Sequence, residues 1–145
     1  MKLVVQRVKE AQVRLIPSNE VIGKIGKGIF ILVGVGRGDD INQIKSLAEK
    51  ISKLRIISDK NGKMNLSVKE TDSEVLVVSQ FTLYADITGG NRPSFIGAAL
   101  SDEAEKIYDE FVNCLKSLGL KVKTGKFGEY MEIYTILDGP VTILY

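Results

Sequence analysis

The chain has no histidine and no tryptophan among its 145 residues, and only one cysteine, Cys114. Without an imidazole, Ser-His-Asp and Cys-His nucleophile systems are excluded, and so is histidine as a general base. Zinc sites rely mainly on cysteine and histidine, so we expect no metal site, and we expect no cofactor. A lone cysteine cannot form an internal disulfide, which is typical of a reducing compartment and predicts a cytoplasmic protein.

Long apolar runs are also missing. The longest, such as Gly28–Gly36, are too short to cross a bilayer, and no basic segment followed by an apolar stretch opens the chain. We therefore expect no membrane association and no signal peptide. The net charge of +2 neither demands nor forbids a nucleic-acid partner. With 44% hydrophobic and 26% charged residues, the composition predicts one globular domain over residues 1–145.

The residue patterns predict an α/β (α+β) chain with many short strands. A first helix is expected over Ile41–Leu54, capped by Asp39 or Asp40, because apolar residues recur there at helical spacing. A second is expected over Asp102–Leu118, capped by Ser101. Many strands with two helices favour a compact β-barrel-like sheet with the helices packed outside. The expected strands are Leu3–Val8, Ala11–Leu15, Val21–Ile25, Ile29–Val33, Val75–Val78, Lys121–Thr124, Met131–Ile136 and Val141–Tyr145.

Two features that suggest chemistry have simpler explanations. Gly34–Gly38 (GVGRG) precedes the first expected helix, but its spacing is not that of a phosphate-binding loop or a dinucleotide fingerprint. We interpret it as a turn between strand and helix. Cys114 lies on the apolar face of the second expected helix, and nothing in the sequence offers it a base. We interpret it as a packing residue rather than a nucleophile.

A polar segment, Ser79–Leu83 (SQFTL), follows a strand that is expected to be buried. Strand ends that emerge from a core often hold functional groups. The alternative is that Ser79 and Thr82 only satisfy backbone groups at the end of the strand, because hydroxyl side chains commonly do so. The pattern alone favours this second interpretation.

Two further segments allow more than one interpretation. Asp138–Thr142 (DGPVT) is either a hairpin turn, since Asp-Gly between apolar residues is a strong turn signal, or a place where backbone carbonyls lie uncovered. Gly89–Phe95 (GGNRPSF) is a loop before the second expected helix. Its Arg92 is either solvated or placed to contact a phosphate or a terminal ribose.

Taken together, these segments resemble the D-aminoacyl-tRNA deacylase family of bacteria and eukaryotes. SQFTL and GPVT are the signature motifs of that family, and their joint occurrence in a chain of this length is highly specific. The resemblance extends over the whole chain, through MKLVVQRV at 1–8, GKMNL at 62–66, VLVVSQFTLYAD at 75–86, GNRPSF at 90–95, TGKFGEYM at 124–131 and DGPVT at 138–142.

The resemblance implies a homodimer that hydrolyses D-aminoacyl-tRNA, and glycyl-tRNA mischarges, at the tRNA 3′ end. It implies an active site at the dimer interface, where the SQFTL strand of one subunit faces a cis Gly-Pro dipeptide of the other. By the same resemblance the catalytic region comprises Ser79, Gln80, Phe81 and Thr82, and the substrate is bound by Leu83, Arg92, Pro93, Gly139, Pro140, Val141 and Thr142.

This chemistry is compatible with a chain that lacks histidine. An aminoacyl-tRNA ester is already activated by its α-ammonium group and by the neighbouring ribose hydroxyl. We expect backbone N–H groups of Phe81 and Thr82 to form the oxyanion hole, with Thr82 orienting rather than attacking. Carbonyls of Gly139 and Pro140 would hold the α-ammonium so that an L side chain collides with the backbone. Glycine, without a Cβ, would escape that rejection.

One position departs from the family pattern. Leu137 stands two residues before Gly139, where the family usually has asparagine, which questions the hydrogen bonds that support this loop. A different class of function also remains open, namely a dimer of the same fold that binds tRNA or DNA without catalysis. The preferred tRNA and amino acid are not predicted by the sequence.

Overall fold

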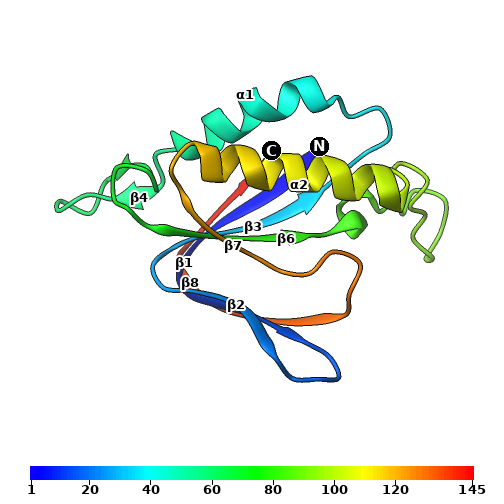
Figure 1. Ribbon diagram of the computed structural model, residues 1–145, viewed down its shortest axis with the longest axis horizontal. Helices are drawn as coiled ribbons and strands as arrows, with labels where there is room; N and C mark the ends of the chain where they lie inside the picture. The colour runs from blue at the N-terminus through cyan, green and yellow to red at the C-terminus, as the bar shows by residue number, and fades with distance from the viewer.

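The computed structural model describes all 145 residues. The two α-helices of the chain lie together over one face of a curved sheet (Figure 1). None of the helices has the length and apolar character needed to span a bilayer. In chain order the elements are β1 (Lys2–Leu15), β2 (Val21–Ile25), β3 (Gly28–Gly34), α1 (Ile41–Ser52), β4 (Ile57–Ser58), β5 (Met64–Leu66), β6 (Glu74–Ser79), the 3-10 helix η1 (Phe81–Tyr84), α2 (Ser101–Ser117), β7 (Lys121–Thr124) and β8 (Met131–Leu144).

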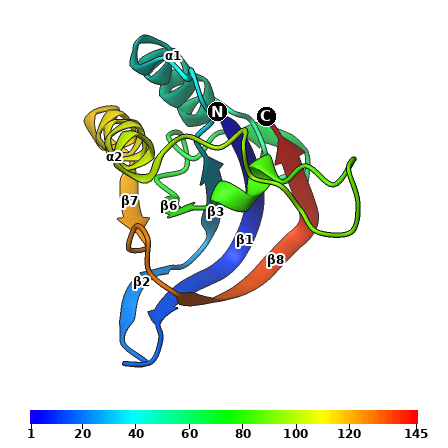
Figure 2. The ribbon, with the colours of Figure 1, turned by 90° about the vertical axis from the view of Figure 1, so that its right-hand side faces the viewer.

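Six strands form one sheet in the order β2-β1-β3-β6-β7, and β8 pairs with the other side of β1. β1 is antiparallel to β2, β3 and β8, whereas β6 is parallel to both of its neighbours. The sheet curls until β2 approaches β7 (Figure 2). Gly23 permits this approach, because a Cβ there would lie 2.7 Å from the carbonyl oxygen of Thr124. The predicted barrel-like sheet with two helices outside it is confirmed.

β3 is buried on both faces, which explains its continuous apolar sequence. Ile29, Ile31 and Val33 belong to the cluster between the sheet and the helices, and Phe30 belongs to a second cluster inside the barrel. Fully burying such a side chain contributes roughly 1.5–3 kcal/mol. The helices supply one apolar stripe each to the first cluster, through Ile44, Leu47, Ala48, Ile51, Ile107, Tyr108, Phe111 and Leu115.

Two predicted strand breaks are wrong. β1 is one strand of 14 residues, because β8 pairs with it along most of its length. β8 is also one strand of 14 residues, so Asp138–Thr142 is not a hairpin turn. Gln6 pairs with Thr142 and Val8 pairs with Leu137, which leaves only Arg7 opposite the four residues between them on β8. The Asp-Gly pair, which predicted a turn, therefore forms a bulge within a strand.

The two aspartates predicted as candidate caps of α1 have different roles. Asp40 caps the helix by accepting from the backbone N–H of Asn42 at 2.8 Å. Asp39 instead accepts from the N–H of Gly36 at 2.6 Å and so closes the glycine-rich turn that follows β3. The helix ends at Ser52, two residues before the predicted end, because the chain there leaves the helical hydrogen-bond ladder.

The predicted cap of α2 is wrong. Ser101 is the first helical residue, and Leu100 occupies the cap position without any side-chain hydrogen bond. The carbonyl of Leu100 already accepts from the N–H of Ala104 at 2.8 Å, which makes it the first acceptor of the helix. Asp102 and Glu103 in the first turn complement the positive end of the helix in place of a capping hydroxyl.

Candidate active site

The SQFTL segment leaves the sheet at the end of β6 and forms the single turn η1. Gln80, which precedes the turn, is tied to β3 by its N–H, which donates to the carbonyl of Val33 at 2.7 Å. The turn is closed by the N–H of Leu83, which donates to the carbonyl of Gln80 at 3.3 Å. The N–H groups of Phe81 and Thr82 have no acceptor in the chain, as is usual at the start of a helix. Two adjacent backbone donors are therefore free to bind a ligand.

Phe81 and Thr82 are exposed, the other side chains of this segment are half-buried, and the segment forms one hydrogen bond between its own side chains. The Gln80 amide donates to the hydroxyl of Thr82 in a short contact. No carboxylate, lysine or other base contacts the Thr82 hydroxyl. Phe81 is 58% exposed, and its ring packs edge-on against that of Phe95, with 5.0 Å between the centroids. Because its hydroxyl has no base beside it, Thr82 is better suited to orient its neighbours than to act as a nucleophile.

An apolar cavity of about 760 Å³ lies beside η1, within the size range of small-ligand sites. Ser79, Gln80 and Phe81 line one side, whereas Thr82 and Leu83 do not line it. Aromatic side chains of two other segments complete the wall, and Arg37 and Glu129 are its charged members. Those aromatic residues are Phe95, Phe127 and Tyr130.

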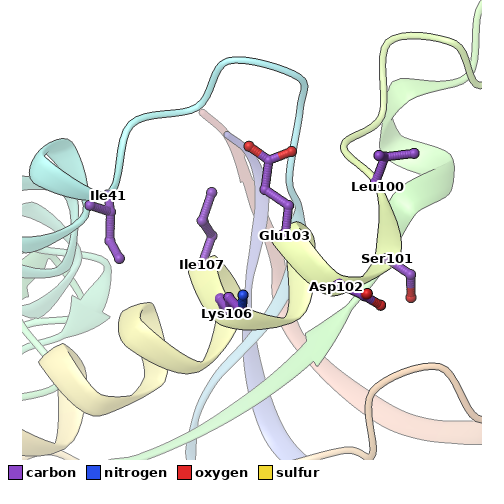
Figure 3. Close-up of a pocket in the computed structure, with 7 residues that line it drawn as sticks. All are labelled: Ile41, Leu100, Ser101, Asp102, Glu103, Lys106 and Ile107. Atoms are coloured by element: carbon purple, nitrogen blue, oxygen red, sulfur yellow. The ribbon is translucent and has the colours of Figure 1, made fainter.

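A second hollow, of about 500 Å³, lies between the starts of α1 and α2 (Figure 3). It contains no residue that the sequence predicted for the site. Its lining mixes apolar side chains with both charges, in Ile41, Leu100, Ser101, Asp102, Glu103, Lys106 and Ile107. No group of three or more His, Cys, Asp or Glu side chains is placed to hold a metal ion.

The DGPVT segment forms the bulge of β8, and the Gly139-Pro140 peptide bond is cis. Arg7 lies opposite the bulge and is only 9% exposed. Its Nε donates to the carbonyl of Asp138 at 3.0 Å and forms an ion pair with the carboxylate of that residue at 3.2 Å. At the end of the bulge, the Gln6 amide donates to the hydroxyl of Thr142 at 3.3 Å. These contacts fix the backbone around Gly139 and Pro140.

Arg7 also explains how the bulge is supported although Leu137 replaces the asparagine that is usual in the family. Leu137 pairs in register with Val8 and is 40% exposed, so its side chain is not an internal support of the bulge. The bulge is supported from β1 by Arg7 instead. Arg7 was not among the predicted site residues. The available signal was its alternation with Leu3 and Val5 along the first strand, which places an arginine on the face of buried apolar side chains.

The structure groups the predicted site residues into three places. Ser79–Leu83 form η1 and the strand end before it, and Gly139–Thr142 lie on β8. β1 and β3 separate these two groups within the chain. Arg92 and Pro93 lie exposed on the loop before α2, outside the large cavity, although Phe95 of the same loop lines it.

Cys114 is half-buried on α2 and lies far along the chain from these groups. Burial raises the pKa of its thiol, and the negative charge of Glu110 raises it further. The thiol is therefore held in its protonated, poorly nucleophilic form. This agrees with its interpretation as a packing residue.

Comparison with known proteins gives a consistent result. The sequence model of the family described as D-Tyr-tRNA(Tyr) deacylase matches residues 4–145. A D-aminoacyl-tRNA deacylase of Thermosipho africanus is 51% identical over 144 residues, which cover 99% of this chain and 95% of that protein. A D-aminoacyl-tRNA deacylase of Desulfatibacillum aliphaticivorans is also 51% identical over 144 residues, covering 99% and 97%.

Two solved structures have the same fold. A protein described as c-Myc DNA Unwinding Element Binding Protein superposes with a TM-score of 0.91 and 40% identity, covering 100% of this chain and 97% of its own. A probable eukaryotic D-amino acid tRNA deacylase superposes with a TM-score of 0.85, covering 99% and 97%, and at 14% identity it is similar in fold alone. On the family match and the relatives near 50% identity, the chain belongs to the D-Tyr-tRNA(Tyr) deacylase family and is a hydrolase.

Proposed function

We propose that the chain hydrolyses the ester bond between a D-amino acid, or glycine, and the 3′ end of tRNA. Water adds to the carbonyl carbon, the bond from that carbon to the ribose oxygen breaks, and the ribose oxygen takes a proton. Free amino acid and tRNA are the products. The observation that supports this best is the pair of free N–H groups at Phe81 and Thr82 beside an aromatic cavity.

The two N–H groups are the proposed oxyanion hole. One such donor is typically worth about 3–4 kcal/mol to the barrier, and backbone donors need no reorganisation as charge develops. The ester supplies the remaining activation through its α-ammonium group and the neighbouring ribose hydroxyl. The side chain of Thr82, which contacts only Gln80, takes no proton and forms no bond to the substrate carbon.

The cavity accepts the terminal nucleoside. Phe81, Phe95 and Tyr130 offer aromatic surfaces, and stacking of a base on such a surface is worth about 1–3 kcal/mol. Arg37 lies at the cavity and forms no ion pair, so its guanidinium is available to a phosphate group. Arg92, on the exposed loop before α2, contacts the tRNA backbone farther from the ester.

A second copy of the chain completes the site. β8 is an edge strand of 14 residues, and a long apolar edge is normally covered. Within one subunit β1 and β3 keep Gly139-Pro140 apart from η1, so a two-fold partner is needed to bring the dipeptide to the ester. The apolar residues exposed along β8 are Ile133, Tyr134, Ile136, Leu137, Ile143 and Leu144.

Chirality is selected by rejection. The carbonyl oxygens of Gly139 and Pro140 from the partner hold the α-ammonium of the amino acid. In that position an L side chain meets the backbone of the bulge, whereas a D side chain points outward whatever its size. Val141 and Thr142 border the same backbone. Glycine has no side chain to reject and is therefore hydrolysed. Because its substrate arises during translation, the protein works in the cytoplasm.

A binding function without catalysis is the second candidate. It is favoured by one observation, the 40% identity to a protein described as binding a DNA unwinding element. A nucleic-acid-binding dimer has no need of two free N–H groups beside an aromatic cavity. The deacylase function therefore fits the geometry better.

The test is deacylation of D-tyrosyl-tRNA by the purified protein, with L-tyrosyl-tRNA in parallel. We expect rapid loss of the D ester while the L ester persists. Hydrolysis of neither ester, together with retention of tRNA or DNA on the protein, would favour the binding function. Equal hydrolysis of both would remove the rejection mechanism and leave the esterase.

A further inference from the structure

The ring of Tyr84, the last residue of η1, packs against the backbone of two glycines. These are Gly34, the last residue of β3, and Gly36, which follows it. A Cβ on Gly36 would lie 2.4 Å from the Tyr84 hydroxyl oxygen, and a Cβ on Gly34 would lie 3.3 Å from Cδ2 of the ring. The ring therefore occupies the space that two side chains would otherwise fill. Removing it would leave η1 without this contact.

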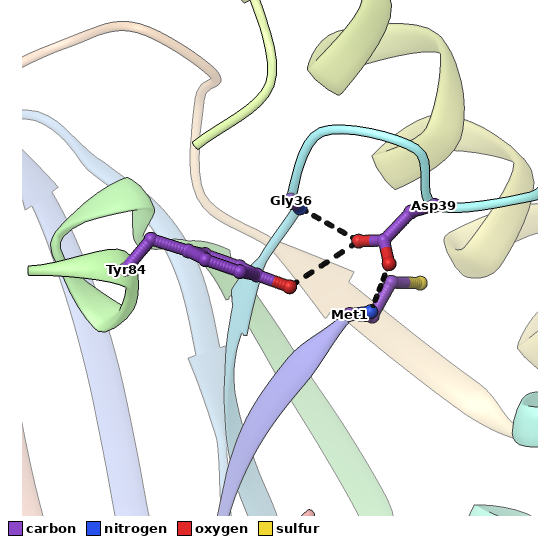
Figure 4. A network of polar contacts seen from close by, with 4 residues as sticks. All are labelled: Met1, Gly36, Asp39 and Tyr84. Atoms are coloured by element: carbon purple, nitrogen blue, oxygen red, sulfur yellow. Dashed lines mark hydrogen bonds and ion pairs between the residues drawn. The ribbon is translucent and has the colours of Figure 1, made fainter. Parts of the chain in front are cut away.

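Two charged residues hold the same ring from other sides. The Nζ of Lys2 lies 4.7 Å from the ring centroid and donates to the carbonyl of Leu83 at 3.1 Å. The carboxylate of Asp39 accepts from the Tyr84 hydroxyl at 3.4 Å, and also from Gly36 and the terminal ammonium of Met1 (Figure 4). Burial, followed by the charge of Asp39, raises the pKa of Tyr84 to about 12, so the hydroxyl remains a donor.

η1 has little else to fix its direction. It is a single turn with no buried residue, and its hydrogen bonds from Leu83 and Ala85 measure 3.3 and 3.0 Å. Short 3-10 turns are only weakly held by their own hydrogen bonds. The free N–H groups of Phe81 and Thr82 must nevertheless converge on one point to stabilise an oxyanion.

We propose that Tyr84 is a positioning residue for this oxyanion hole, acting through its contacts with Gly36, Lys2 and Asp39. This inference rests on the proposed deacylase function. The side chain of Tyr84 extends from η1 toward Asp39, to which its hydroxyl donates (Figure 4), so Tyr84 acts on the site without touching the substrate. A misplacement of the donors by about 1 Å can cost on the order of 100-fold in rate. Tyr84 prevents that displacement.

The experiment measures kcat and KM for D-tyrosyl-tRNA in three variants and one control. Tyr84→Ala should lower kcat by roughly 10- to 100-fold while KM changes less than about threefold, because binding in the cavity is retained. Tyr84→Phe, which keeps the ring, should recover kcat to within about threefold of wild type. Lys2→Met should lower kcat by an intermediate amount. It gives a second test if Tyr84→Ala does not fold.

The matched control is Val112→Ala, which removes buried volume from α2 without touching η1. It should lower the melting temperature at least as much as Tyr84→Ala and leave kcat unchanged. Equal losses of kcat in Val112→Ala and Tyr84→Ala would overturn the proposal, and so would wild-type kcat in Tyr84→Ala. If wild type itself has no deacylase activity, the proposed function fails. The position of η1 is then read from amide hydrogen exchange at Leu83 and Ala85, whose N–H groups donate within the turn. Exchange there should accelerate in Tyr84→Ala and not in Val112→Ala.

A double-mutant cycle tests the packing directly. Gly36→Ala forces the ring of Tyr84 away and should lower kcat in the wild-type background. In Tyr84→Ala the obstacle is gone, so adding Gly36→Ala should cost nothing more. Additive losses would mean that Gly36 acts on the site without Tyr84 and would contradict the inference.

Discussion

Arg7 binds Asp138 twice from one nitrogen, through the backbone carbonyl at 3.0 Å and through the carboxylate at 3.2 Å. Its Nη1 donates to the carbonyl of Ile56 at 2.9 Å and to the hydroxyl of Ser58 at 3.0 Å. One almost buried side chain therefore joins the bulge of β8 to the segment that enters β4. With the hydrogen bond from Gln6 to Thr142, this connection holds the backbone that presents Gly139.

Replacing Arg7 by lysine should weaken this connection although the charge is kept. A single ammonium cannot serve Asp138 and Ile56 together, and a buried group left without its partner costs about 1–3 kcal/mol. We expect the free energy of unfolding to fall by that amount in urea denaturation, and the ratio of D- to L-tyrosyl-tRNA hydrolysis to fall with it. Arg55→Lys is the control, because Arg55 is exposed and donates to the Asn65 carbonyl. Equal discrimination in both variants would sink the role of Arg7 at the bulge.

Gly139→Ala should damage the bulge for two reasons. The residue has φ of +130°, where a side chain is strained, and its Cβ would lie 2.9 Å from Cγ2 of Val141 and 3.3 Å from Nη2 of Arg7. We expect D-tyrosyl-tRNA hydrolysis to fall at least 10-fold, or discrimination against the L ester to be lost. Gly62→Ala is the control, with φ of +78° and nothing within 4 Å. If both variants retain wild-type discrimination, the backbone at Gly139 does not select chirality.

Thr82→Ala should keep most of the activity. Its hydroxyl contacts only the Gln80 amide and no base, so its loss should cost less than about 10-fold in kcat. Single-turnover hydrolysis of D-tyrosyl-tRNA measures this directly. A loss of more than about 1,000-fold that Thr82→Ser restores would falsify the orienting role and make the hydroxyl the nucleophile.

The sequence predicted the elements correctly where a local pattern determines them. The stripes of α1 and α2 follow from helical spacing, and the burial of β3 follows from its continuous apolar run. The caps were less predictable. Ser101 has the preferred side chain for a cap, yet Leu100 occupies the cap position and its carbonyl is the first acceptor of α2. Local preference was overridden there by the path of the chain.

The parts of the site that the sequence missed depend on contacts between distant segments. Arg7 meets Asp138 only because β1 pairs with β8, and Tyr84 meets Gly36 only because β6 lies beside β3. The hairpin interpretation of Asp138–Thr142 failed for the same reason, since β1 continues through the region and pairs with β8 on both sides of the bulge. Periodicity cannot predict such partners, because they are set by the order of strands in the sheet.

Charge on the outer part of β8 should separate the proposed subunits. Ile136 and Ile143 are 40% and 37% exposed in the single chain, and a lysine at each position would place ammonium groups in the proposed apolar interface. We expect the double variant Ile136→Lys, Ile143→Lys to sediment as a monomer and to lose deacylase activity. Lysine at Val21 and Met64, which are exposed on β2 and β5, should leave both properties unchanged. A monomeric wild type with full activity would contradict the two-subunit site.

Arg37→Gln should reduce the salt dependence of tRNA binding. Arg37 is exposed at the cavity, where its backbone N–H donates to the Gly97 carbonyl at 3.0 Å, and it has no carboxylate partner. If it contacts one phosphate group, its removal should lower the slope of log affinity against log salt by about 0.7–1. The slope is measured by filter binding of tRNA over a salt series. Lys60→Gln, in the turn between β4 and β5, removes the same charge at the opposite end of the molecule (Figure 1) and should leave the slope unchanged. An equal change in both variants would mean that Arg37 adds only to the general field of the protein and does not bind the tRNA end.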